Sequence, residues 1–196
     1  MIPVKICGIT SYEDAKIAVN YGASAIGMIF YKESPRYIYP QKVSDWISDI
    51  PAKVKKVGVF VDEKQKNIKT IVEELNLDYI QLHGYESSEY CNKMIRPVIK
   101  AFRVGINFDP SVINNFQVHA FLFDTYQKGK PGGTGKGFNW NLISSLKTDI
   151  PIILSGGLNY ENIAKGIEAV RPSAIDVNSG VELEPGIKDK MKIIEL

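Results

Sequence analysis

The sequence has few of the residues that mark disulfide-rich, metal-binding or nucleic-acid-binding proteins. Its 196 residues include two cysteines and two histidines, so we expect neither a disulfide framework nor a metal site. The 24 basic and 22 acidic residues leave a formal net charge of +2, which favours neither a nucleic-acid nor a membrane partner. No apolar run approaches the ~20 residues of a membrane span, and the N-terminus has no signal-peptide pattern. We therefore expect a cytoplasmic protein.

What the sequence does contain is an alternation of two kinds of segment. Short runs rich in Val, Ile and Phe predict strands, and longer polar-faced stretches predict amphipathic helices. The expected strands are 4–8, 25–30, 55–61, 79–83, 98–103, 120–124, 151–155 and 174–178. The expected helices are 11–22, 40–50, 64–76, 86–95, 139–147 and 159–170, with one or two turns at 109–116 and a short closing helix at 186–196.

The strands lack the polar–apolar alternation of a half-exposed sheet. Segments such as 57–61 (Val-Gly-Val-Phe-Val) and 152–154 (Ile-Ile-Leu) are apolar throughout, which is typical of a parallel sheet covered by helices on its outer face. Eight βα units predict an α/β protein with one compact (β/α)8 TIM-barrel domain over residues 1–196, in which helices five and eight are short. The alternative is an open doubly wound sheet, which usually needs five or six strands.

The segment Val-Lys-Ile-Cys-Gly-Ile-Thr at residues 4–10 places a cysteine where a strand gives way to a helix. Thr10, followed by Glu13, predicts the helix N-cap. Cys7 is either a buried small residue or a catalytic group, because the carboxyl ends of β/α-barrel strands hold the chemistry. A free thiol has a pKa of roughly 8.5 and needs a helix N-terminus or a cation to ionise near pH 7. Lys5 is the nearest cation in the sequence.

Three other polar side chains follow predicted strands. Asp124 ends the strand 120–124, where a carboxylate either caps a loop or has a function. His83 ends the strand 79–83, where it either has a function or satisfies a local backbone hydrogen bond. Arg36, in a loop that Pro35 stiffens, has the guanidinium geometry for bidentate binding of a carboxylate or phosphate.

Two glycine motifs follow the last two strands of the predicted barrel. Gly156 and Gly157 lie in Ser-Gly-Gly-Leu-Asn, and Ser179 and Gly180 lie in Asn-Ser-Gly-Val-Glu. Such loops after strands seven and eight are the usual phosphate site of a barrel, so they predict phosphate binding. The glycine- and lysine-rich segment 128–137 does not match a P-loop, and we expect it to close over an anionic ligand.

Taken in order, these motifs resemble one family. The motifs occur here in the order Lys-Ile-Cys-Gly-Ile-Thr, Ser-Pro-Arg, Val-Gly-Val-Phe-Val, Gln-Leu-His-Gly, Phe-Asp-Thr, Gly-Gly-Thr-Gly, Ser-Gly-Gly-Leu and Ser-Gly-Val-Glu. Together they resemble those of the phosphoribosylanthranilate isomerase family. The resemblance spans roughly residues 3 to 183. Two small departures are Asn178, where the family often has Ser, and a short, Lys-rich tail after Gly186.

The resemblance implies an Amadori rearrangement in tryptophan biosynthesis by general acid–base catalysis. It makes Cys7 the general base and Asp124 the general acid. It implies a phosphorylated small-molecule substrate, no cofactor and no metal, and we expect a monomer or a homodimer. The substrate-binding residues that we expect are Arg36, His83, Gly156, Gly157, Asp176, Ser179 and Gly180.

Three other functions compete with this interpretation. The sugar isomerases of histidine biosynthesis look to use carboxylates at strands one and five, whereas these strands end here in Cys7 and in Phe102-Arg103. Indole-glycerol-phosphate synthases carry an N-terminal extension and catalytic lysines, whereas this chain is expected to start at strand one. A non-catalytic phosphosugar-binding barrel would keep the glycine motifs and lose the acid or the base, and both are present.

Overall fold

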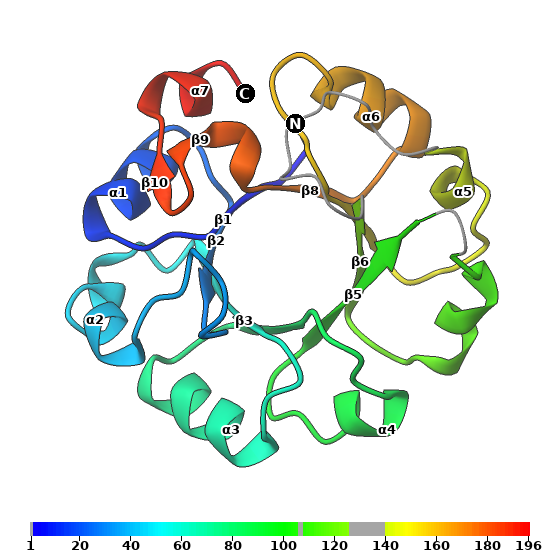
Figure 1. The fold of residues 1–196 in the computed structure, drawn as a ribbon, viewed down its shortest axis with the longest axis horizontal. Coiled ribbons are helices and arrows are strands. Elements are labelled where there is room, and N and C mark those ends of the chain that lie inside the picture. Colours follow the sequence, from blue (N-terminus) through cyan, green and yellow to red (C-terminus); the bar gives the residue numbers. More distant parts are fainter. Residues whose placement is uncertain (1, 106–107, 126–139) are drawn as a thin grey trace.

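The computed structural model describes residues 2–105, 108–125 and 140–196, and its strands close into a barrel (Figure 1). The eight parallel strands are β1 (Val4–Cys7), β2 (Ala25–Ile29), β3 (Lys55–Phe60), β4 (Tyr79–Leu82), β5 (Val98–Val104), β6 (Ala120–Thr125), β7 (Ile152–Leu154) and β8 (Ala174–Val177). All lie within one residue of the expected ranges at either end. β1 pairs with β8, with Lys5 opposite Asp176, so the TIM-barrel prediction is confirmed and the open sheet is excluded.

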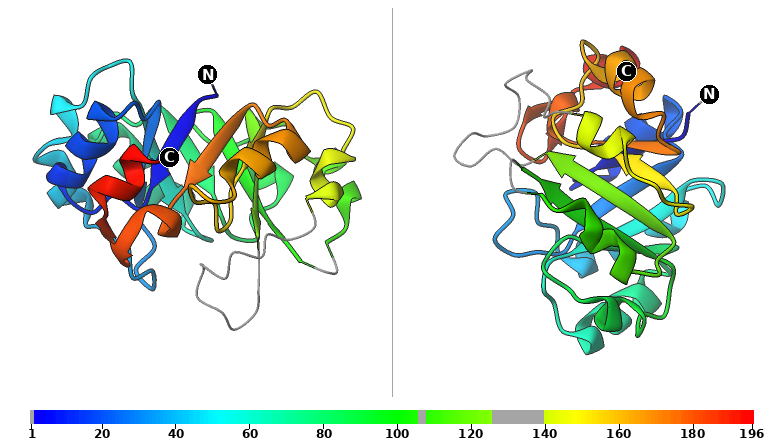
Figure 2. Two further views of the ribbon diagram at one scale, coloured as in Figure 1. Left: turned by 90° about the horizontal axis from the view of Figure 1, so that it is seen from above. Right: turned by 90° about the vertical axis from the view of Figure 1, so that its right-hand side faces the viewer.

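The helices surround the barrel and are shorter than the sequence predicted (Figures 1 and 2). They are α1 (Tyr12–Asn20), α2 (Pro40–Ser44), α3 (Gln65–Glu74), α4 (Ser88–Cys91), α5 (Asn141–Ser144), α6 (Ile163–Val170) and α7 (Lys190–Ile194). Three 3-10 helices accompany them: η1 (Ile47–Asp49), η2 (Pro110–Asn115) and η3 (Ser179–Val181). The fifth helical position is thus the 3-10 helix η2 and the eighth is the five-residue α7, as expected. The segment 128–137 lies outside the described residues.

The predicted cap of α1 is wrong by one residue. Ser11, rather than Thr10, is the N-cap, and its hydroxyl accepts a hydrogen bond from the Asp14 N–H. The hydroxyl of Thr10 instead donates to the carbonyl of Gly186, which lies 176 residues further along the chain. A tertiary contact therefore uses the side chain that a local rule would assign to the helix end.

A two-stranded hairpin after the barrel was not predicted. β9 (Glu182–Glu184) and β10 (Ile187–Lys188) pair antiparallel, and Gly186 supplies the positive φ of +90° at the turn. The carbonyl of Val181 accepts a hydrogen bond from Asp189 N–H, which closes the base of the hairpin. The expected closing helix 186–196 therefore starts only at Lys190.

Buried side chains form two layers around the strands. The smaller layer comprises side chains of β3, β5, β6 and β7, namely Val57, Ile99, Ala101, Ala120, Leu122 and Ile153. The larger layer packs the other face of the strands against the helices. Cys91 belongs to this second layer, where burial raises the pKa of its thiol to about 11. In the described part of the chain, no helix is both long enough and apolar enough to span a membrane.

Candidate active site at the carboxyl ends of the strands

The side chains of Lys5 and Cys7 lie on one face of β1, because successive residues of a strand alternate between faces. Cys7 is the last residue of β1 and only 4% exposed. Gly27 of β2 is paired with Cys7 and makes room for it, since a Cβ there would lie 3.0 Å from Cys7 Sγ and from Lys5 Nζ. A side chain at residue 27 would therefore crowd both groups.

Lys5 forms a buried ion pair across the closure of the barrel. Its Nζ lies 2.7 Å from Oδ1 of Asp176 on β8, and the two side chains are 5% and 4% exposed. The hydroxyl of Ser155 donates to the carbonyl of Asp176 and lies 3.4 Å from its Oδ2. The carboxylate of Asp176, a residue that we expect at the substrate site, thus contacts both Lys5 and Ser155.

The charges around Cys7 oppose one another. Burial raises the pKa of the Cys7 thiol, the Lys5 cation acts to lower it, and the Asp176 carboxylate acts to raise it. Lys188, which lies on the hairpin, also acts to lower it. The net result is a pKa above the ordinary value, because desolvation disfavours the thiolate most strongly. Lys5 is therefore the main group that favours ionisation of this thiol.

Asp124 contacts a histidine from another unit of the barrel. Its Oδ2 lies 3.2 Å from Nε2 of His83, the first residue after β4. The other ring nitrogen, Nδ1, lies 3.1 Å from Nε2 of Gln81, whose side chain is buried in β4. With the amide N–H of Gln81 donating to Nδ1, the neutral ring carries its proton on Nε2 and donates it to Asp124. Gln81 thus orients His83, and His83 holds the carboxyl group of Asp124.

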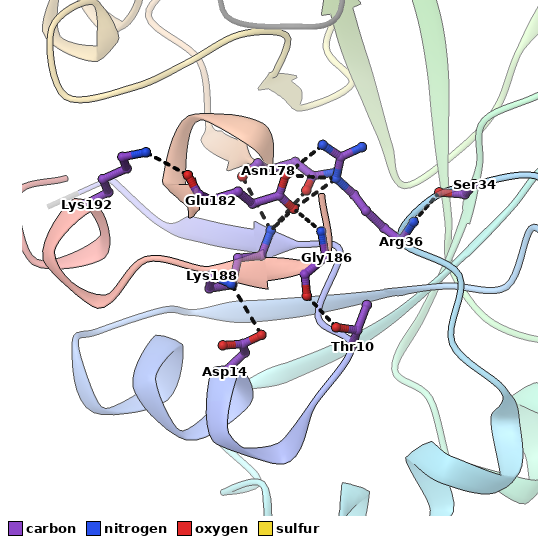
Figure 3. A network of polar contacts seen from close by, with 9 residues as sticks. All are labelled: Thr10, Asp14, Ser34, Arg36, Asn178, Glu182, Gly186, Lys188 and Lys192. Carbon is purple, nitrogen blue, oxygen red and sulfur yellow. Dashed lines mark hydrogen bonds and ion pairs between the residues drawn. The ribbon is translucent and has the colours of Figure 1, made fainter. Parts of the chain in front are cut away.

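Arg36 lies in the loop after β2 and binds a carboxylate of the chain itself. Its Nε is 2.9 and 3.0 Å from the two carboxylate oxygens of Glu182, and its Nη2 is 2.6 Å from Oε2 (Figure 3). Gly8 allows this approach, since a Cβ at Gly8 would lie 2.9 Å from Arg36 Cδ. The Arg36 side chain remains 19% exposed. The guanidinium therefore lies next to the residue that follows Cys7.

The glycine loops after β7 and β8 contact each other. A Cβ at Gly180 would lie 1.8 Å from the carbonyl oxygen of Leu158, so only glycine fits there. Gly156 and Gly157 adopt φ values of +89° and +66°. Within the described chain, no backbone carbonyl accepts a hydrogen bond from the N–H of Gly157 or Gly180. The expected helix at 159–170 starts only at Ile163, so the glycines precede it by a full turn.

The structure thus places all the expected site residues at or near the carboxyl ends of the strands. The sequence reasoning missed Gln81, Glu182 and Lys188. A polar residue inside the apolar segment Ile-Gln-Leu was the available signal for Gln81, whereas nothing local marked Lys188. No group of three His, Cys, Asp or Glu side chains among the described residues could hold a metal ion.

The fold and the position of these residues define a (β/α)8-barrel protein with polar groups gathered at the carboxyl ends of its strands. The family model described as N-(5'phosphoribosyl)anthranilate (PRA) isomerase matches residues 4–196. The chain belongs to this family.

Relatives and solved structures agree with the family model over almost the whole chain. An N-(5'-phosphoribosyl)anthranilate isomerase of Trichlorobacter lovleyi is 45% identical over 196 residues, covering 100% of this chain and 96% of the relative. The crystal structure of phosphoribosyl anthranilate isomerase from Thermotoga maritima is 40% identical, with a TM-score of 0.90 and coverage of 100% and 96%. A third match is a crystal structure of phosphoribosyl anthranilate isomerase in complex with reduced 1-(o-carboxyphenylamino)-1-deoxyribulose 5-phosphate. It is 38% identical, has a TM-score of 0.84, and covers 100% of this chain and 96% of that chain.

Proposed function

We propose that this protein isomerises N-(5'-phosphoribosyl)anthranilate to 1-(2-carboxyphenylamino)-1-deoxyribulose 5-phosphate, a step of tryptophan biosynthesis. The family match over residues 4–196 carries this proposal. The geometry supports it, because a cysteine on β1 and an aspartate on β6 both lie at the mouth of the barrel. The reaction moves two protons and leaves the overall oxidation level unchanged, so it needs no redox cofactor.

Asp124 is the proposed general acid. It donates a proton to the furanose ring oxygen as the C1–O bond breaks, and the ring opens to a Schiff base. Its carboxyl group is about one-third exposed, with a side-chain exposure of 31%, so a substrate can reach it. When Asp124 carries its proton, His83 accepts a hydrogen bond at Nε2 and its Nδ1–H donates to the carbonyl oxygen of a rotated Gln81 amide. Oε1 of Gln81 is buried without a partner among the described residues, so it has the capacity for that bond.

Cys7 is the proposed general base. As a thiolate it removes the proton from C2 of the sugar, and the resulting enolamine tautomerises to the ketone. Lys5 stabilises the thiolate, and Asp176 holds Lys5 in place through their 2.7 Å ion pair. We therefore assign Asp176 a positioning role through Lys5, rather than contact with the substrate.

The remaining residues bind the two anionic ends of the substrate. Arg36 is proposed to bind the anthranilate carboxylate. The backbone N–H groups of 156–157 and 179–180 are proposed to bind the phosphate, since glycines allow a close approach to an anion. Ser179 and Gly180 belong to η3, a short 3-10 helix of the kind that often completes the phosphate site of a barrel.

Turnover of the anthranilate adduct, followed by the change in its fluorescence, tests the proposal. We expect the wild-type protein to be active, and Cys7→Ala and Asp124→Asn each to lower kcat by about 10²–10⁴-fold, the usual contribution of a general acid or base. Cys91→Ala is the matched control, because it removes the other thiol from the outer layer and leaves the mouth of the barrel intact. Wild-type turnover in Cys7→Ala would refute the base assignment.

We also infer a reducing, cytoplasmic location and a monomeric or homodimeric state. Both cysteines are free thiols, and oxidation of Cys7 would abolish the proposed base. One solved structure is of monomers generated from the phosphoribosylanthranilate isomerase of Thermotoga maritima, and it describes that enzyme as dimeric. Light scattering of the purified protein determines the number of subunits.

A further inference from the structure

The hairpin after the barrel lies against the first βα unit and brings two buried charged residues to the mouth. Its backbone is fixed at two points, where the Thr10 hydroxyl donates to the Gly186 carbonyl and the Lys188 N–H lies 3.4 Å from Oδ2 of Asp14 (Figure 3). Glu182 of β9 and Lys188 of β10 both point from this hairpin toward Arg36. The hairpin is therefore packed as part of the mouth, next to β1.

Glu182 holds one edge of the Arg36 guanidinium. Nε and Nη2 form that edge, and both donate to the Glu182 carboxylate. Among the described residues, none accepts a hydrogen bond from Nη1. A guanidinium has a second edge, formed by Nη1 and Nη2, that binds another carboxylate in bidentate geometry. Glu182 thus fixes the plane of the guanidinium and leaves this second edge for a ligand.

Lys188 balances the charge of Glu182. Its Nζ lies 2.8 Å from Glu182 Oε1 and 3.0 Å from Oδ1 of Asn178, and its side chain is fully buried. The amide of Asn178 lies over Gly8, where a Cβ would meet its Oδ1 at 2.6 Å. Burial acts to raise the pKa of the Glu182 carboxyl, but the hydrogen bonds from Arg36 and Lys188 outweigh it, and the pKa lies below the usual value. Glu182 is therefore held as a carboxylate.

The Arg36–Glu182–Lys188 cluster holds one more cation than carboxylates. Arg36 and Lys188 both pair with the carboxylate of Glu182, whereas Asp176 pairs with Lys5. This excess suits a ligand that carries an anionic group of its own. An alternative role for Glu182, competition with the ligand for Arg36, is disfavoured because the carboxylate occupies only one edge of the guanidinium.

We propose that Glu182 and Lys188 are positioning residues of the active site, which orient the free edge of Arg36 toward the carboxylate of the substrate. This inference rests on the proposed function. It makes the hairpin a determinant of specificity for an aromatic amine that carries a carboxylate, although neither side chain has to touch the substrate.

Two substrates and four variants test this role. The substrates are the phosphoribosyl adducts of anthranilate and of aniline, which lacks the carboxylate. The variants are Glu182→Gln, Arg36→Met, their combination, and Glu184→Gln as the matched control. Glu184 lies in the same strand β9 and is exposed. Thermal melts of each variant confirm that it folds.

We expect Glu182→Gln to raise KM for the anthranilate adduct by about tenfold or more, as for a weakened charge-assisted hydrogen bond, with little change in kcat. For the aniline adduct, KM of Glu182→Gln should match that of the wild-type protein. In the Arg36→Met background, Glu182→Gln should have no further effect, because Glu182 acts through Arg36. Glu184→Gln should behave as wild type with both substrates.

An equal rise in KM for both adducts, or no rise at all, would overturn the positioning role. If Glu182→Gln does not fold, the double variant Glu182→Gln/Lys188→Met, which removes both buried charges, takes its place. This double variant should raise KM for the anthranilate adduct only. An equal rise in KM for both adducts would again refute the positioning role. The outcome for the wild-type protein separates the two proposals. An inactive wild type contradicts the proposed function, whereas an active wild type with an unselective Glu182→Gln contradicts only this inference.

Discussion

Replacing Gly180 by alanine tests whether the contact between the two glycine loops sets the geometry of the phosphate site. The Cβ of alanine would lie 1.8 Å from the carbonyl oxygen of Leu158 and 3.1 Å from Asn159 Cβ. The nearest group is backbone, which cannot turn aside as a flexible side chain can. Either η3 or the loop after β7 must therefore move.

The size of the movement follows from these distances. Real Cβ contacts are essentially never shorter than 3.0 Å, so the loops must separate by at least the difference between 1.8 and 3.0 Å, about 1.2 Å. A displacement of about 1 Å at a binding site can cost 10²-fold in rate. We therefore expect kcat/KM of Gly180→Ala to fall by roughly 100-fold, with weaker inhibition by inorganic phosphate.

The fluorescence assay with the anthranilate adduct gives kcat/KM, and competitive inhibition by inorganic phosphate reports on the phosphate site alone. Gly22→Ala is the control, since Gly22 has a positive φ of +95° and open space for a Cβ, and it lies in the turn between α1 and β2. This variant should lose about 1 kcal/mol of stability from backbone strain and keep its kinetics. If Gly180→Ala retained wild-type kcat/KM and phosphate inhibition, the contact would not set the geometry of the site.

Three further predictions concern the buried charges on and around β1. Lys5→Met leaves Asp176 buried without its cation, so we expect the free energy of unfolding, measured with urea, to fall by about 3–5 kcal/mol. The double variant Lys5→Met/Asp176→Leu should recover most of this stability while its activity stays low. An equal loss of stability in both variants would contradict the pairing. Because burial raises the pKa of the Cys7 thiol and the thiolate is the form that an alkylating reagent attacks, the rate of Cys7 alkylation, measured in Cys91→Ala, should rise with pH through neutrality and into the alkaline range. Lys188→Met removes a cation that lowers this pKa, so it should move the rise to higher pH, and an unchanged pH profile would exclude this effect.

Local patterns were sufficient for the barrel. Each βα unit has its own apolar strand and polar-faced helix, and the strand positions were correct to within one residue. Helix ends were predicted less well, because tertiary contacts compete with capping rules. At Thr10, a hydrogen bond to Gly186 replaced the expected cap. The sequence of the hairpin β9–β10 lacks the alternation of apolar and polar residues that predicts strands, because its buried residues include the charged Glu182 and Lys188 on opposite strands.

The sequence by itself determined which residue types stand at the carboxyl ends of the strands, since each of those positions depends on one βα unit. Only the tertiary structure decided which of these groups meet. Lys5 and Asp176 are 171 residues apart in the chain, and Arg36 and Glu182 are 146 apart, so no local spacing could pair them. The physical reason is the closure of the barrel, which brings β8 and the hairpin beside β1 and surrounds Cys7 with charges from distant units.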